Sequence, residues 1–201
     1  MSLKYNYAIY CSGKATRIVN YYEKYNIIDF LPKVIVYDGG IALIEKKLNN
    51  LFGTNLINYS HDQTLSKKKQ SHLLSSFLLK EFNSKEIDYV FCFGSKILKP
   101  ILINSYKNKI INFHPSLLPK FPGLNAIDQA ILNNEKVLGN TAHFIDEGID
   151  SGEILLQTKI NYSDYKNYDS VLDLQLEMLN VLWNTIETDV NKLKELYKLY
   201  D

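Results

Sequence analysis

Residues 7–25 read YAIYCSGKATRIVNYYEKY, which is a short apolar run, a turn and an amphipathic segment in succession. The apolar residues 7–11 have the length of a buried strand, Ser12-Gly13 marks a turn, and residues 16–25 have a helical pattern. The same succession recurs along the first half of the chain, with strands predicted at 33–37, 55–59 and 89–93 and helices at 42–51 and 64–82. Strands that alternate with helices indicate βαβ units. We therefore predict an α/β fold, a mostly parallel open sheet with helices on both faces.

The second half has a different pattern. After a predicted strand at 110–113, residues 114–125 hold Pro115, Pro119, Pro122 and Gly123, which predict an ordered loop without helix. A helix is predicted at 126–133, two strands at 141–145 and 153–160, and a long helix with at most one break at 171–199. No linker or repeat divides the chain, so we predict a single domain over residues 1–201.

Composition excludes several classes of protein. The 201 residues are 46% hydrophobic and 22% charged with a net charge of +1, which is typical of a globular protein and gives no field that would attract polyanions. Arg17 is the only arginine among the 23 basic residues, which argues against a DNA-reading surface. Cys11 and Cys92 lie in apolar runs and are interpreted as buried free thiols. We find no signal pattern and no run of 18 apolar residues, and predict a cytoplasmic protein without membrane contact.

Chemistry-bearing side chains gather at the end of the strand predicted at 110–113. Asn112 and His114 are two residues apart and therefore point to the same side. An amide donor beside an imidazole suits acyl transfer, because the amide can stabilise an oxyanion and the imidazole can move a proton. Asp150, in a glycine-flanked loop, is the carboxylate that would orient the imidazole. The alternative is that His114 and Asp150 only stabilise loops.

Three blocks of sequence resemble the folate-dependent formyltransferases. They are NFHPSLLPKFPG at 112–123, GNTAHF followed by IDSG within 139–152, and GSKILKP at 94–100. The resemblance is nearest to the glycinamide ribonucleotide transformylases and implies a Rossmann-like fold and formyl transfer from 10-formyltetrahydrofolate, without a metal. It assigns the catalytic roles to Asn112, His114 and Asp150, and a supporting role to His143.

The resemblance also implies a folate pocket and an acceptor loop. Lys96, Ile97 and Leu98 would contact the folate from one loop, and Ile145, Asp146 and Glu147 from another. Without the flanking blocks, Ile97 and Leu98 would be interpreted as core residues. His61 and His72 lie outside all three blocks and are interpreted as ordinary surface or helix residues.

The acceptor loop departs from the family pattern Gly-x-Gly-Ser-Asn. Here residues 13–17 read Gly13, Lys14, Ala15, Thr16 and Arg17. A backbone turn at a helix N-terminus suits a phosphate, and the two added cations would strengthen that preference. The alternative is that Lys14 and Arg17 are solvated residues of the first helical turn. A family glutamate in the C-terminal helix has no secure counterpart among Gln175, Glu177 and Leu179.

The acceptor amine is therefore left open. A small phosphorylated amine similar to glycinamide ribonucleotide is the first expectation, and the alternatives are a nucleotide-linked amino sugar, hydrolysis of the formyl donor, and a non-catalytic folate-binding protein. Nucleic acid is not expected as a partner, because the chain has no basic excess. The sequence does not indicate an oligomeric state.

Overall fold

The computed structural model describes residues 3–25, 31–164 and 168–196, which divide into two compact units, Met1–Ile110 and Ile111–Asp201. Across both, the seven strands belong to one mostly parallel open sheet, which confirms the predicted fold class. The single domain over residues 1–201 stays a prediction. None of the helices among the described residues is long and apolar enough to cross a membrane.

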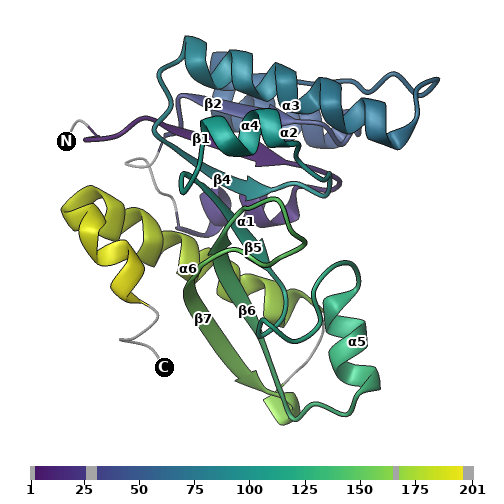
Figure 1. Ribbon diagram of the computed structural model, residues 1–201, viewed down its shortest axis with the longest axis vertical. Coiled ribbons are helices and arrows are strands. Elements are labelled where there is room, and N and C mark those ends of the chain that lie inside the picture. The colour runs from purple at the N-terminus through teal and green to yellow at the C-terminus, as the bar shows by residue number, and fades with distance from the viewer. Residues whose placement is uncertain (1–2, 26–30, 165–167, 197–201) are drawn as a thin grey trace. The chain divides into compact units, whose positions relative to one another are not determined.

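The first unit is built from βα repeats. Its elements are β1 (Tyr7–Cys11), α1 (Thr16–Tyr25), β2 (Val34–Tyr37), α2 (Ala42–Phe52), a 3-10 turn (Gly53–Asn55), β3 (Leu56–Asn58), α3 (Lys67–Ser84), β4 (Tyr89–Phe93) and α4 (Pro100–Ser105). The strands pair in parallel in the order β3-β2-β1-β4, with Ala8 opposite Val34 and Val90. Their carboxyl ends therefore meet at one edge, as the parallel arrowheads of β1 and β4 show (Figure 1).

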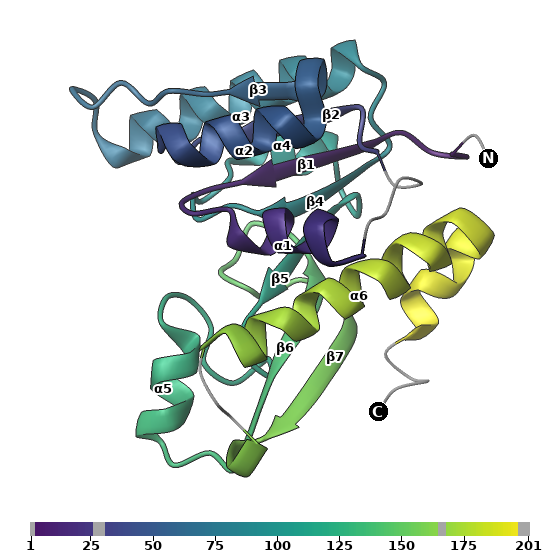
Figure 2. The ribbon, with the colours of Figure 1, turned by 180° about the vertical axis from the view of Figure 1, so that it is seen from behind.

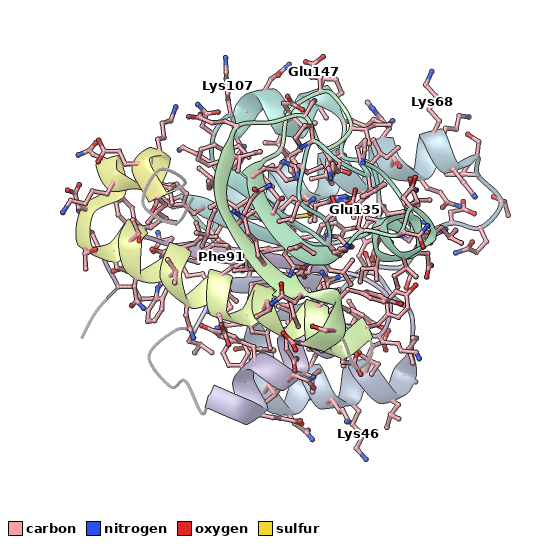
Figure 3. All side chains as sticks on the ribbon, turned by 90° about the horizontal axis from the view of Figure 1, so that it is seen from below. Lys46, Lys68, Phe91, Lys107, Glu135 and Glu147 are labelled. Atoms are coloured by element: carbon pink, nitrogen blue, oxygen red, sulfur yellow. The ribbon has the colours of Figure 1, made fainter. Side chains whose placement is uncertain are left out.

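The strands of this unit are covered on both faces, which explains their continuous apolar runs. Helices α3 and α4 lie on the face toward the viewer in Figure 1, and α1 and α2 lie on the opposite face (Figure 2). Every residue of β1 and β2 is buried. Figure 3 shows the contrast between Phe91, which is 0% exposed, and Lys46 and Lys68, which point outward from their helices. Cys11 and Cys92 are buried free thiols, as predicted.

The second unit is antiparallel. Its elements are β5 (Ile110–His114), α5 (Ala126–Leu132), β6 (Val137–Phe144), β7 (Ile154–Asn161), a 3-10 turn (Tyr162–Asp164), α6 (Tyr168–Asp189) and a 3-10 segment (Val190–Glu195). Strand β6 pairs with both β5 and β7, and α6 packs across β6 and β7 (Figure 2). Residues 115–125 form no helix or strand, which confirms the predicted loop.

Most differences from the predicted elements lie at their ends. Helix α3 begins at Lys67 because the Ser66 hydroxyl caps it, accepting a hydrogen bond from the Lys69 amide at 3.4 Å. The long C-terminal helix breaks after Asp189, whose carboxylate caps the next turn at Asn191. Residues 197–199 of that prediction lie outside the described residues. The six-residue helix α4 was not predicted, although Pro100 at its first turn is a typical start signal.

Candidate active site

The second unit brings Asn112, His114 and Asp150 together. Asn112 and His114 lie on β5 and face the same side, as their spacing predicts, and Asp150 follows β6 in the loop before β7. One Asp150 carboxylate oxygen, Oδ2, lies 3.2 Å from His114 Nδ1, and the other, Oδ1, lies 3.5 Å from Asn112 Nδ2. Asp150 is 36 positions from His114 and 38 from Asn112 in sequence, so the tertiary fold creates these contacts.

The loop backbone supplies two further polar contacts. The Phe121 carbonyl lies 2.8 Å from His114 Nε2, and the Gly123 amide donates to Asp150 Oδ2 at 2.8 Å. Phe121 has a φ of 55° and Asp150 a φ of 51°, both in the left-handed region that most residues avoid. Such strain is held in place by the surrounding bonds and is frequent at functional sites.

Side chains of β6 and β7 form hydrogen bonds to the backbone of the loop at residues 115–125. The Thr141 hydroxyl donates to the Ser116 carbonyl at 2.7 Å and accepts from the Leu118 amide at 3.0 Å. Gln157 on β7 donates to the Leu118 carbonyl at 2.9 Å, and the Ser116 hydroxyl donates to the Lys120 carbonyl at 2.6 Å. The loop is thus ordered by buried hydrogen bonds in addition to its prolines.

His143 lies directly opposite Asn112 in the β5–β6 pairing. Its Nδ1 lies 2.9 Å from the Phe144 carbonyl, so Nδ1 carries the proton and Nε2 is left as an acceptor for the Asn112 amide at 3.2 Å. His143 Nε2 also lies 3.5 Å from Asp150 Oδ1. His143 is 2% exposed and contacts the Asn112 amide, and its supporting role stays a prediction.

The electrostatics of His114 reflect two opposing effects. Burial lowers the pKa of His114, and it outweighs the Phe121 carbonyl and the Asp150 carboxylate, both of which raise it. Burial would raise the pKa of Asp150, but the contact with His143, the hydrogen bond from the Gly123 amide and the nearby His114 outweigh it and hold that pKa below its usual value. Both His114 nitrogens face oxygen acceptors, so the protonated ring can donate from both, whereas burial favours the neutral ring.

The coupling between His114 and Asp150 can be measured directly. Asp150→Asn removes the negative charge that raises the pKa of His114, so we expect this pKa to fall further below 6.5 in the variant. An NMR titration of the histidine ring signals in both proteins would test this. Asp128→Asn, a change on the exposed side of α5, serves as the control and should leave the titration of His114 unchanged. A rise, or no change, in the Asp150 variant would contradict the coupling.

The predicted acceptor loop connects β1 and α1 in the first unit. Gly13 and Ala15 have φ values of 60° and 45°, so Ala15 occupies a conformation that glycine prefers. The Tyr37 hydroxyl donates to the Gly13 carbonyl at 2.6 Å. Lys14 and Thr16 are exposed, whereas Arg17 is partly buried, with its guanidinium carbon 5.2 Å from the centre of the Phe93 ring. Arg17 is thus not a simply solvated residue of the first turn.

The predicted folate-contacting residues lie on two loops, one in each unit. On the first, Ile97 is 65% exposed while Leu98 is 6% exposed, so the core interpretation fails for Ile97 and holds for Leu98. On the second, Asp146 accepts hydrogen bonds from the Gly148 amide at 3.0 Å and the Ser151 hydroxyl at 2.9 Å, which closes the loop that carries Asp150. The remaining residues of the two sets, Lys96, Ile145 and Glu147, lie on the same loops.

The structure excludes one candidate residue and corrects one interpretation. Gln175, one of the candidates in the C-terminal helix, cannot contact a substrate, because it is 0% exposed and donates to the Asn140 side-chain oxygen Oδ1 and to the Phe113 backbone carbonyl. His61 is not a surface residue: its side chain is 5% exposed and lies 2.7 Å from the Asp38 carboxylate. His72 is an exposed helix residue, as predicted. Among the described residues, no group of three metal-ligating side chains is arranged to hold an ion.

Comparison with known proteins places this site in a family. The family model described as "Formyl transferase" matches residues 34–175. The chain belongs to the formyl transferase family. The matched region of this formyl transferase contains all of the catalytic candidates and both loops predicted to contact folate.

Individual relatives are similar over parts of the chain. Phosphoribosylglycinamide formyltransferase of Bacillus subtilis is 35% identical over 95 residues, which cover 47% of this chain and 49% of the relative. The Escherichia coli protein of the same name is 40% identical over 65 residues, 32% of this chain and 31% of the relative. The matched segments thus span half or less of these curated relatives.

Solved structures are similar over nearly the whole chain. Phosphoribosylglycinamide formyltransferase from Bacillus halodurans has a TM-score of 0.66 at 29% identity, covering 96% of this chain and 94% of that one. The corresponding enzyme from Streptococcus pneumoniae has a TM-score of 0.70 at 20% identity, covering 90% and 97%, which shows the shared fold.

Proposed function

We propose that this formyl transferase moves a formyl group from 10-formyltetrahydrofolate to the primary amine of a small phosphorylated acceptor, with glycinamide ribonucleotide as the first candidate. The observation that carries the proposal is the contact of Asp150 with both His114 and Asn112 in one unit. The names of the relatives support the choice of acceptor. The cytoplasmic location stays a prediction.

The chemistry assigns one task to each side chain. The acceptor amine attacks the formyl carbon, and the carbonyl oxygen gains negative charge. The Asn112 amide donates a hydrogen bond to that oxygen, and the positive charge of the protonated His114 imidazole stabilises it. A proton leaves the amine nitrogen and reaches the folate nitrogen as the carbon–nitrogen bond of the donor breaks, with Asp150 assisting through His114 or a water molecule. The products are the formylated amine and tetrahydrofolate, so atoms and charge balance.

The test is an assay with labelled formyl donor, two acceptors and a reaction without acceptor. The purified chain is given glycinamide ribonucleotide, a dTDP-linked amino sugar, or no amine. We expect label on glycinamide ribonucleotide. Label found only on the sugar would identify the amino sugar as the acceptor in place of glycinamide ribonucleotide. Release of formate alone would indicate hydrolysis of the donor. Donor binding without any turnover would indicate a non-catalytic folate-binding protein.

Arg17 provides a test of the phosphate on the acceptor. If the loop of residues 13–17 binds a phosphate, Arg17→Ala should raise the acceptor KM about tenfold or more, since a hydrogen bond to a charged group contributes about 1.5–3 kcal/mol. The KM of the formyl donor should stay unchanged. Steady-state kinetics with each substrate varied in turn would measure both values. Lys46→Ala, an exposed change on α2, is the control, and an unchanged acceptor KM in the Arg17 variant would refute the assignment.

A further inference from the structure

A buried polar cluster lies at the carboxyl ends of the parallel strands in the first unit. It consists of Tyr10 at the end of β1, Asp38 directly after β2, and His61 three residues after β3. The Tyr10 hydroxyl donates to Asp38 Oδ2 at 2.8 Å, and His61 Nε2 lies 2.7 Å from the same oxygen. The side chains of Asp38 and His61 are 1% and 5% exposed, and Tyr10 is 1% exposed.

The direction of each hydrogen bond in this cluster follows from its chemistry. A carboxylate only accepts, so His61 Nε2 carries a proton and donates it to Asp38. Burial, followed by the nearby Asp38 charge, raises the pKa of Tyr10 far above its usual value, so its hydroxyl stays a donor. His61 Nδ1 is buried and has no hydrogen-bond partner among the described residues. The Nε2 bond to Asp38 is therefore the polar contact that holds the His61 ring.

The cluster continues into the loops that follow β1 and β4. The Ser12 hydroxyl donates to the Tyr10 hydroxyl oxygen at 3.3 Å and accepts from the Ser95 amide at 3.1 Å. A Cβ atom at Gly94 would come within 2.0 Å of the Tyr10 ring, so the ring packs directly against this backbone. Four loops, one from each parallel strand, are thus connected through one carboxylate and one tyrosine.

Two of those loops carry residues that the proposed function uses. Ser12 precedes Gly13 and the predicted phosphate-binding residues, and Ser95 precedes Lys96 of the predicted folate segment. Ligands of open α/β sheets bind at this edge, where loop conformation decides affinity. Buried hydrogen bonds restrict the groups that share them to one arrangement, and losing one donor leaves its buried acceptor short of a partner.

We propose that His61 is a positioning residue: by donating to Asp38 it holds Tyr10 and Ser12 in place, and so presets the acceptor loop at residues 13–17. The link to acceptor binding rests on the proposed function, whereas the link to loop order does not. Nothing in this role requires His61 to touch a substrate.

A matched pair of substitutions isolates the Nε2 donor. In His61→Gln the side-chain amide nitrogen reaches nearly the position of Nε2 and keeps the hydrogen bond to Asp38. The shorter side chain in His61→Asn does not reach Asp38 and loses this bond. Both variants remove the edge-on ring contact with Tyr59, which has centroids 5.1 Å apart, so this contact cancels in the comparison. His72→Ala, an exposed change on α3, is the control.

Two readouts are compared in these variants. Hydrogen exchange should be about tenfold faster at the amides of residues 12–18 in His61→Asn, and close to wild type in His61→Gln and His72→Ala. The acceptor KM should rise about tenfold in His61→Asn, with kcat at saturating acceptor within about twofold of wild type. If His61→Asn does not fold, Tyr10→Phe removes the hydrogen bond from Tyr10 to Asp38 at nearly constant side-chain volume. This variant should show the same faster exchange and the same rise in acceptor KM.

The outcomes separate this proposal from the proposed function. Unchanged exchange at residues 12–18, or equal effects of the asparagine and glutamine substitutions, would overturn the positioning role. Faster exchange with an unchanged acceptor KM would overturn the link to the acceptor. If the wild-type chain formylates no amine, the proposed function fails, and the exchange comparison still decides whether His61 positions the loop.

Discussion

Asp150→Asn is expected to lower kcat by at least about 10²–10³-fold while leaving the fold intact. Asp150 Oδ2 accepts from Gly123 and faces His114 Nδ1, and Oδ1 faces His143 and Asn112. An asparagine amide cannot accept both of these hydrogen bonds. Its NH₂ group would face a donor in either orientation, the Gly123 amide in one and the Asn112 amide in the other. The loss therefore combines a missing charge beside His114 with a misdirected donor.

The backbone makes this substitution a chemical test more than a structural one. Asp150 has a φ of 51°, and asparagine tolerates that left-handed conformation as well as aspartate does. Single-turnover and steady-state rates at saturating formyl donor would measure the loss. Asp128→Asn, on the exposed side of α5, should turn over at the wild-type rate. Unchanged turnover in the Asp150 variant would remove Asp150 from the mechanism.

Asn112→Ala is expected to cost about 10²–10³-fold in kcat, the usual effect of losing one oxyanion donor. Asn112 Nδ2 points at His143 Nε2 at 3.2 Å and at Asp150 Oδ1 at 3.5 Å. The longer contact is the weaker one, so a formyl oxygen can take the hydrogen that now points toward Asp150. The alanine variant has no such hydrogen to offer.

Kinetics and stability together would distinguish a lost donor from a damaged strand. The measurement is kcat with both substrates saturating, accompanied by a thermal unfolding curve. Asn133→Ala, on the exposed end of α5, provides the control for a lost asparagine. A large fall in kcat at nearly unchanged Tm supports the oxyanion role. A fall in Tm that accounts for the whole loss of activity would contradict it.

Much of this fold could be predicted because its signals are local. The apolar runs of β1, β2 and β4 are buried throughout or nearly so, as expected for strands covered on both faces. The common side of Asn112 and His114 follows from the two-residue period of a strand. Prolines and glycine identified the loop after β5, because they act on the backbone at their own positions.

The contacts that complete the site required the tertiary structure. The β5–β6 register decides that His143 faces Asn112, and a shift of one residue would turn it to the opposite side. The contacts of the Phe121 carbonyl and the Gly123 amide could not be predicted from the side-chain pattern, because both are backbone groups. His61 was misinterpreted because it lies outside all three blocks of resemblance, and only the adjacency of β1, β2 and β3 brings it to Asp38.

Residue order along the chain thus sufficed for the α/β fold, for the side on which Asn112 and His114 lie, and for the motifs that indicate formyl transfer. Those properties depend on neighbours a few residues apart. The contacts among Asn112, His114 and Asp150, and the buried environment of His61, depend on strand register and loop closure over tens of residues. Such contacts form only when the packed sheet brings distant segments together, because that is when buried polar groups must find their partners.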